Sequence, residues 1–234
     1  MISATVVTHP GCARSENQDS VLIPGFCSTG LTAEPVMFRS SSATAVYAVI
    51  DGMGGHVGGQ QASRSVSFYL AEQRTADIAS LLDGANRMLY ERMERSPELT
   101  GMGATIAGVA FADDEATAFN VGDARVYHYA DGYLMLLTKD DRSSPTSHAV
   151  TQSLGGAGRL TAIAPHTFPL EPLRSHERLL VCSDGLTEVV AFDEISEALS
   201  DPDPCRSASL LLHQALDGGA PDNVTFILIE KQGD

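Results

Sequence analysis

Short polar links between neighbouring apolar runs constrain the fold of this chain more than any other feature. Runs rich in Val, Ala and Tyr occupy residues 104–112, 116–121, 125–129 and 133–137, and only a few residues separate each run from the next. Such runs are typical of β-strands. A link of two to four residues allows a hairpin but not a helical crossover. The middle of the chain is therefore predicted to be antiparallel.

The remaining segments complete an α+β pattern. Further strands are predicted at residues 44–50, 178–182 and 224–229. Helices are predicted at 60–73, 78–95, 192–200 and 206–216, and the second of these carries a clear apolar stripe. Helices grouped between blocks of antiparallel strands favour sheet packed on sheet with helices outside. We expect the Pro-, Gly- and Ser-rich stretches 25–42 and 142–164 to be loops.

Composition restricts the kind of protein further. The length of 234 residues is typical of one domain spanning 1–234. No apolar run approaches the roughly 20 residues that a membrane helix needs, and the first residues carry no export pattern, so we expect a soluble protein in the cytoplasm. We also expect a monomer. The four cysteines form no Cys-x-x-Cys pair and are expected to be reduced structural thiols.

The net charge of −15, from 30 acidic and 15 basic residues, argues against a nucleic-acid partner. Binding a phosphate backbone needs clustered Lys and Arg. For most of the acidic side chains, solubility is a sufficient explanation. The exceptions are aspartates at the ends of apolar strands.

Four aspartates share this position, each beside a turn residue: Asp51, Asp123, Asp184 and Asp222. Any one of them alone is more often a simple turn residue. Several converging carboxylates would be too costly without compensating cations. Their all-oxygen chemistry suits Mg²⁺ or Mn²⁺.

The strings around these aspartates, taken in order, resemble the motifs of the PPM (type-2C) metal-dependent serine/threonine protein phosphatases, in their bacterial form. The matching strings stand at residues 11–19, 49–56, 103–105, 120–125, 151–155, 183–187 and 222–225. The resemblance implies a four-layer α-β-β-α sandwich with two central, mainly antiparallel sheets. It also implies hydrolysis of phosphoserine and phosphothreonine by direct attack of a metal-bridging hydroxide.

The resemblance assigns a metal site residue by residue. Asp51 is similar to the aspartate that bridges both core ions, and the carbonyl of Gly52 to a ligand of one of them. Asp184 and Asp222 resemble ligands of the other ion. The expected cofactors are two core Mn²⁺ or Mg²⁺ ions, with a weaker third ion beside them.

Three further residues receive roles from the same resemblance. Asp19 is similar to an acid that orients metal-bound water from outside the ligand set. Arg14 matches the arginine that grips the substrate phosphate. His56 resembles the general acid, although a lone His after two glycines is often only a turn residue.

The chain departs from the bacterial pattern in two places. The string at 137–143 lacks an expected His and reaches Thr151 after a few residues, so the flap around 141–151 is severely shortened. The third ion would use Asp123 and Asp184, but Glu188 stands where an aspartate often completes that site. Flap-dependent substrate recognition and the geometry of the third site are therefore open.

An active phosphatase is favoured over two alternatives. A pseudophosphatase acting as a metal-binding interaction module should have lost a metal aspartate or Arg14, and none is missing. A metal-dependent nuclease should carry a basic groove, which the acidic composition does not offer. The expected partners are phosphorylated proteins, either targets of a bacterial Ser/Thr kinase or the kinase itself.

Overall fold

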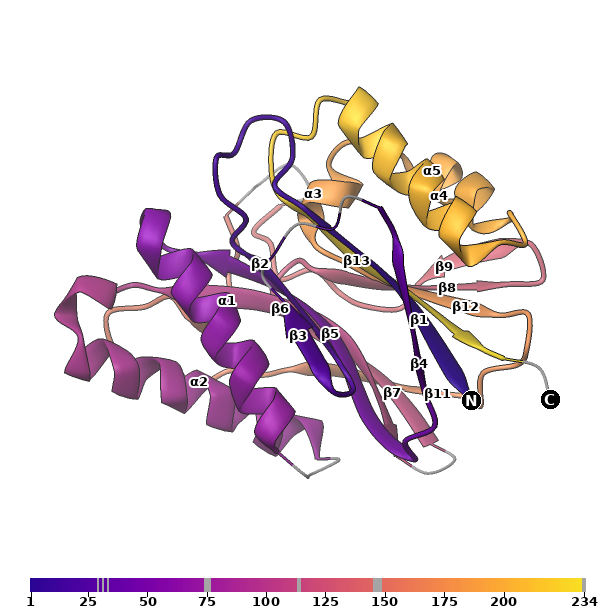
Figure 1. Cartoon of the computed structure of the whole chain (residues 1–234). Helices are drawn as coiled ribbons and strands as arrows, with labels where there is room; N and C mark the ends of the chain where they lie inside the picture. Colours follow the sequence, from indigo (N-terminus) through magenta and orange to yellow (C-terminus); the bar gives the residue numbers. More distant parts are fainter. Residues whose placement is uncertain are drawn as a thin grey trace.

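The structure of the chain is a computed structural model (Figure 1). It describes residues 1–28, 30, 32, 34–73, 77–112, 115–144 and 149–232, without the side chains of residues 55–57.

Two β-sheets form the centre of the molecule. Sheet A has the order β4 (Val36–Ser40), β1 (Ile2–His9), β13 (Val224–Lys231), β12 (Arg178–Cys182), β8 (Arg125–Ala130) and β9 (Tyr133–Leu136). Sheet B has the order β11 (His166–Leu170), β7 (Glu115–Val121), β6 (Gly103–Ala112), β5 (Thr44–Met53), β2 (Asp19–Ile23) and β3 (Phe26–Ser28), and β10 (Leu154–Gly155) also pairs with β6. The strand pairings of the described residues are all antiparallel.

Helices cover the outer face of each sheet. In Figure 1, α1 (Gly55–Glu72) and α2 (Ile78–Arg95) lie along sheet B, and a short 3₁₀ turn, η1 (Pro97–Leu99), follows α2. On the opposite side, α4 (Phe192–Leu199) and α5 (Pro204–Asp217) lie along sheet A, beside the single-turn helix α3 (Asp184–Thr187). This arrangement confirms the predicted α-β-β-α order.

Alternation along the strands divides the core into three layers. In β5, Val49 points into the layer between the sheets, whereas Ile50 packs under α1 and α2. In β13, Ile227 belongs to the layer between the sheets and Phe226 to the layer under α4 and α5. All four side chains are fully buried, and each contributes about 1.5–3 kcal/mol of hydrophobic stabilisation. Burial on both faces explains why these strands are continuous apolar runs in the sequence.

The predicted strands and helices are present, with corrections at their edges. The stretches expected to be loops contain β3, β4 and β10, and the first helix begins at Gly55, five residues before its predicted start. β4 is a half-exposed strand that pairs with β1 at the edge of sheet A. Its strand conformation therefore depends on a long-range pairing that periodicity cannot reveal.

The prediction that every short link in the middle of the chain joins two antiparallel neighbours is wrong for one link. Residues 122–124 join β7 of sheet B to β8 of sheet A, so the chain crosses between the sheets at this point. β6 pairs with β7 and β8 pairs with β9 in the antiparallel direction, as predicted. The crossing places Asp123 at the common end of both sheets.

The shortened flap is described in part. Arg142 and Val150 form an isolated antiparallel bridge, which brings the two sides of the segment together. Residues 145–148 lie outside the described residues. Among the described helices, none has the length and apolar character required to cross a membrane.

Candidate active site

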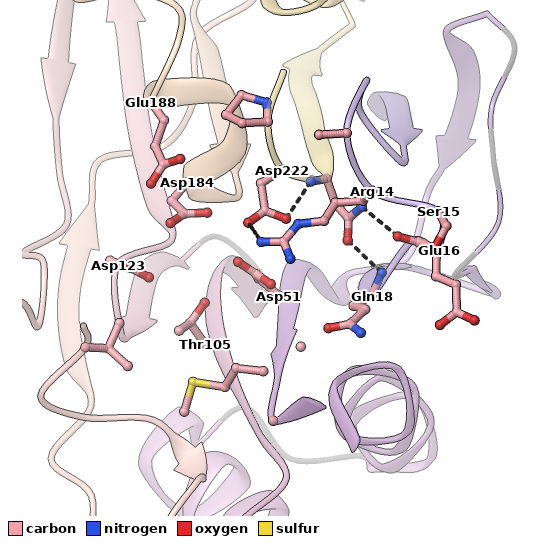
Figure 2. Close-up of a pocket in the computed structure, with 17 residues that line it drawn as sticks. Arg14, Ser15, Glu16, Gln18, Asp51, Thr105, Asp123, Asp184, Glu188 and Asp222 are labelled. Carbon is pink, nitrogen blue, oxygen red and sulfur yellow. Dashed lines mark hydrogen bonds and ion pairs between the residues drawn. The ribbon is translucent and has the colours of Figure 1, made fainter. Parts of the chain in front are cut away.

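An acidic pocket of about 830 Å³ opens where both sheets end. Figure 2 shows the carboxylates of Asp51, Asp123, Asp184, Glu188 and Asp222 facing this space, with Arg14 on one side. Gly52 also lines the pocket. The structure therefore brings together every predicted metal-site residue and the predicted phosphate-binding arginine.

The sheet topology explains this convergence. Asp51 stands near the end of β5, opposite Asp19 of β2 and Thr105 of β6. Asp184 is the first residue of α3 after β12, and Asp222 stands two residues before β13. β12 and β13 are neighbours in sheet A, so Asp184 and Asp222 lie next to each other. They meet Asp51 of sheet B at one end of the molecule.

Two glycines make this close approach possible. A Cβ atom on Gly52 would lie 2.1 Å from the carbonyl oxygen of Gly59 in α1. Gly122, just before Asp123, has φ +98° and faces the Thr105 side chain, which a Cβ would approach to 2.5 Å. Only glycine satisfies both the backbone conformation and the space at Gly122.

Asp19 lies behind the pocket rather than in its lining. Its side chain is buried, Ser183 Oγ donates to its Oδ2 at 2.9 Å, and its Oδ1 has no hydrogen-bond partner among the described residues. Burial raises the pKa of Asp19 to about 6, although hydrogen bonds from Thr225 and Ser183 oppose the shift. A buried acceptor without a partner fits a water or cation at this position.

The pocket carboxylates raise one another's pKa values. Burial, followed by the charges of Asp19, Asp184 and Asp222, raises the pKa of Asp51 well above its usual range. Burial and the charges of Asp123 and Glu188 raise the pKa of Asp184 to about 8. Such shifts mark a site that needs added positive charge to keep its carboxylates ionised.

Arg14 is held on a loop that Asn223 anchors. Asn223 Nδ2 donates to the carbonyl oxygens of Pro10 and Glu16, and its Oδ1 accepts from the Gln18 backbone N–H. The Arg14 Nη2 donates to Asp222 Oδ2 at 2.7 Å, the contact drawn in Figure 2. The sequence interpretation did not assign a role to Asn223, although its place beside Asp222 in the matching string was a signal.

Arg142 is the second arginine of the site, and the sequence interpretation missed it. Its Nε donates to Asp123 Oδ2 at 2.7 Å and its Nη2 to Asp184 Oδ2 at 3.0 Å. The Nη2 also lies 3.9 Å from Glu188 Oε1. The available signal was that Arg142 follows the position of the missing His in the shortened flap.

The donor chemistry fits a pair of hard divalent cations. Carboxylate oxygens and the Gly52 carbonyl are the ligand types that Mn²⁺ and Mg²⁺ prefer, and Asp19 supplies an unpartnered oxygen behind them. As placed, no three His, Cys, Asp or Glu side chains of the described residues form a closed ligand set. Arg14 and Arg142 instead engage Asp222, Asp123 and Asp184.

His56 lies in the first turn of α1, after Gly54. Its side chain is outside the described part of the structure. Its role as a general acid therefore stays a prediction.

Comparison with known proteins gives a consistent result. The sequence profile of protein phosphatase 2C matches residues 34–218. The serine/threonine protein phosphatase PstP of Mycobacterium tuberculosis is 34% identical over 227 residues, covering 83% of this chain and 43% of PstP. The serine/threonine phosphatase stp of Listeria monocytogenes is 26% identical, covering 83% of this chain and 88% of stp. The chain thus spans less than half the length of one relative and most of another.

Solved structures agree. A PstP catalytic domain in complex with two manganese ions is 30% identical, with a TM-score of 0.78 and full coverage of both chains. The structure of the serine/threonine phosphatase of S. agalactiae is 25% identical, with a TM-score of 0.81, covering 99% of this chain and 100% of the other. With a matched profile over most of its length, an α-β-β-α fold and an acidic pocket built from the family's strings, the chain belongs to the protein phosphatase 2C family.

Proposed function

We propose that this protein is a metal-dependent phosphatase that removes phosphate from phosphoserine and phosphothreonine in proteins. The observation that carries the proposal is the convergence of Asp51, Asp184 and Asp222 in one pocket with Arg14 at its side. Three carboxylates provide a charge that divalent cations must compensate, and an arginine offers a paired-donor site for a phosphate.

Two core ions, Mn²⁺ or Mg²⁺, would be held by Asp51, the Gly52 carbonyl, Asp184 and Asp222. When bound, such a pair lowers the pKa of water and compensates charge on a phosphoryl group. The manganese ions of the related PstP catalytic domain support this choice of metal. Loading the site would also compete with Arg14 for Asp222, because both use the same carboxylate.

The side chains around the ions have separable tasks. Arg14, released from Asp222, is long enough and exposed enough to bind a phosphate at the pocket mouth. Asp19 accepts from Ser183 with one oxygen, which fixes its orientation, and its other oxygen, without a partner among the described residues, would accept from metal-bound water. His56 would protonate the departing serine or threonine oxygen.

A third, weaker ion would need Asp123, Asp184 and Glu188. The same three side chains face the guanidinium of Arg142. Third-ion binding therefore requires Arg142 to withdraw.

The substrates are proposed to be phosphoproteins made by a Ser/Thr kinase. The cytoplasmic location, the single domain and the monomeric state expected from the sequence stay predictions.

Phosphate release from phosphoserine and phosphothreonine peptides with Mn²⁺ tests the proposal, with Asp51→Asn as the matched variant. The variant removes a charge but almost no volume, so circular dichroism should show an intact fold. We expect release by the parent protein and a loss of orders of magnitude in the variant. Metal binding without turnover by the parent would identify a binding module, and cleavage of DNA or RNA instead of phosphopeptides would identify a nuclease.

A further inference from the structure

Arg142 extends from the shortened flap to the carboxylates of Asp123 and Asp184, which line the acidic pocket, and its side chain is nearly enclosed there. Its side chain is only 11% exposed, and the partner carboxylates of Asp123 and Asp184 are 4% and 17% exposed. Both contacts are charge-assisted hydrogen bonds, made by two different nitrogens of one guanidinium. The two contacts, one to a buried and one to a half-buried carboxylate, fix the direction in which the guanidinium points.

The backbone that carries Arg142 is held independently of these contacts. The preceding residue, Asp141, accepts from the Gly122 backbone N–H and from Gln152 Nε2 through Oδ2. Its Oδ1 lies 2.9 Å from His166 Nε2 of β11. Asp141 thus ties the segment to the residue before Asp123, to the far side of the flap and to the edge of sheet B.

A second clamp holds the residue before that. Arg125 makes a paired contact with Asp140, from Nε to Oδ1 at 3.0 Å and from Nη2 to Oδ2 at 2.7 Å. On the other side, Arg142 itself pairs with Val150 across the flap. Because three successive residues are anchored by separate partners, Arg142 is aimed at the carboxylates by the fold and not only by attraction to them.

We propose that Arg142 is a tethered cation that takes the place of the third ion in this protein. The guanidinium already binds one oxygen, Oδ2, of Asp123 and of Asp184 and lies 3.9 Å from Glu188 Oε1. These are the three carboxylates that a third ion would need. An ion and a guanidinium cannot share the same oxygens at close contact. The chain therefore operates with two exchangeable ions, and a third binds only at concentrations that displace Arg142.

The inference rests on the two core ions of the proposed function, but its test measures bound metal rather than turnover. Metal-free protein is dialysed against a series of Mn²⁺ concentrations, and bound ions per chain are counted by elemental analysis. The variants are Arg142→Gln, which removes the charge, and Arg142→Lys, which keeps a positive charge. Arg206→Gln is the matched control, because Arg206 pairs with Asp201 on the surface, 73% exposed.

At the Mn²⁺ concentrations that saturate the two core ion sites, we expect two bound ions per chain in the parent, in Arg142→Lys and in Arg206→Gln. Arg142→Gln should bind a third ion at roughly 10-fold or more lower Mn²⁺, as expected on removing a competitor with charge-assisted bonds. Adding Asp123→Asn to Arg142→Gln should return the count to two and so assign the new site.

Two results would overturn the inference. One is a third ion in the parent with the same affinity as in Arg142→Gln. The other is a count of two in Arg142→Gln at every Mn²⁺ concentration while its melting profile shows a folded protein. A parent that binds no Mn²⁺ at all would instead contradict the two core ions of the proposed function.

Discussion

Replacing Asp184 with asparagine should stabilise the metal-free protein. Burial, with the charges of Asp123 and Glu188, raises the pKa of Asp184 from 3.8 to about 8. A carboxyl whose pKa is higher in the folded than in the unfolded state favours folding most at pH values below the unfolded pKa. That contribution is lost as the pH rises through the folded pKa. An amide of the same shape removes this dependence.

The magnitude follows from the pKa difference. At pH 7, keeping Asp184 protonated in the fold costs about 4 kcal/mol relative to the unfolded chain. The charge attraction of Arg142 is already contained in this pKa. Poorer geometry of the hydrogen bond from the Arg142 guanidinium to an amide costs about 2 kcal/mol in the other direction. The net gain is about 2 kcal/mol, or roughly 4–8 °C in melting temperature for a protein of this size.

Thermal melts in a chelator measure this effect. The gain expected for Asp184→Asn at pH 7 should vanish near pH 5, where protonating the carboxyl costs the parent little. Asp217→Asn, an exposed change in α5, should stay within about 0.5 kcal/mol at both pH values. Saturating Mn²⁺ should stabilise the parent and not Asp184→Asn. A destabilised variant at pH 7 in chelator, or an equal gain at both pH values, would refute the reasoning.

Three further predictions follow from the same site. Protons should compete with Mn²⁺ for the site, because the pKa values of Asp51 and Asp184 are raised. Calorimetric titrations should therefore show a Mn²⁺ affinity that increases from pH 6 to pH 8, as expected when metal binding releases protons. An affinity that does not change with pH would contradict this. Arg14→Ala should raise KM for phosphopeptides more than it lowers kcat if the arginine holds the bound phosphate throughout, and unchanged steady-state kinetics would remove it from the site. His56→Gln should slow phosphoserine-peptide hydrolysis by roughly 10²–10⁴-fold and p-nitrophenyl phosphate hydrolysis far less, because only the serine alkoxide needs a proton; equal losses would make His56 structural.

Most of the helices and strands could be predicted from short-range patterns in the sequence. The antiparallel pairings of β6 with β7 and of β8 with β9 were predicted from the short polar links in the sequence, and α2 from its apolar stripe. β1 was not predicted, although it is nearly completely buried between β4 and β13. Its Ser and Thr residues weaken the apolar pattern, and its pairing partner lies at the other end of the chain. Such long-range pairing is not encoded in local periodicity.

The site was predictable where its residues stand in recognisable strings. Asp51, Asp184 and Asp222 were identified from their strings, and the structure gathers them in one pocket. Arg142 was not identified, because its function depends on where the shortened flap places it. The contact with Asp123 requires both the crossing between the sheets and the anchoring of Asp141. Neither can be inferred from the spacing of residues in the sequence.

The most direct test of metal-dependent phosphatase activity is phosphate release from a phosphothreonine peptide as Mn²⁺ is returned to metal-stripped protein. Bound ions are counted in the same samples. The structure predicts no release without metal, and activity that appears as two ions per chain are bound. Full release after exhaustive chelation, or release that does not follow metal occupancy, would contradict a mechanism that depends on Asp51, Asp184 and Asp222 holding ions.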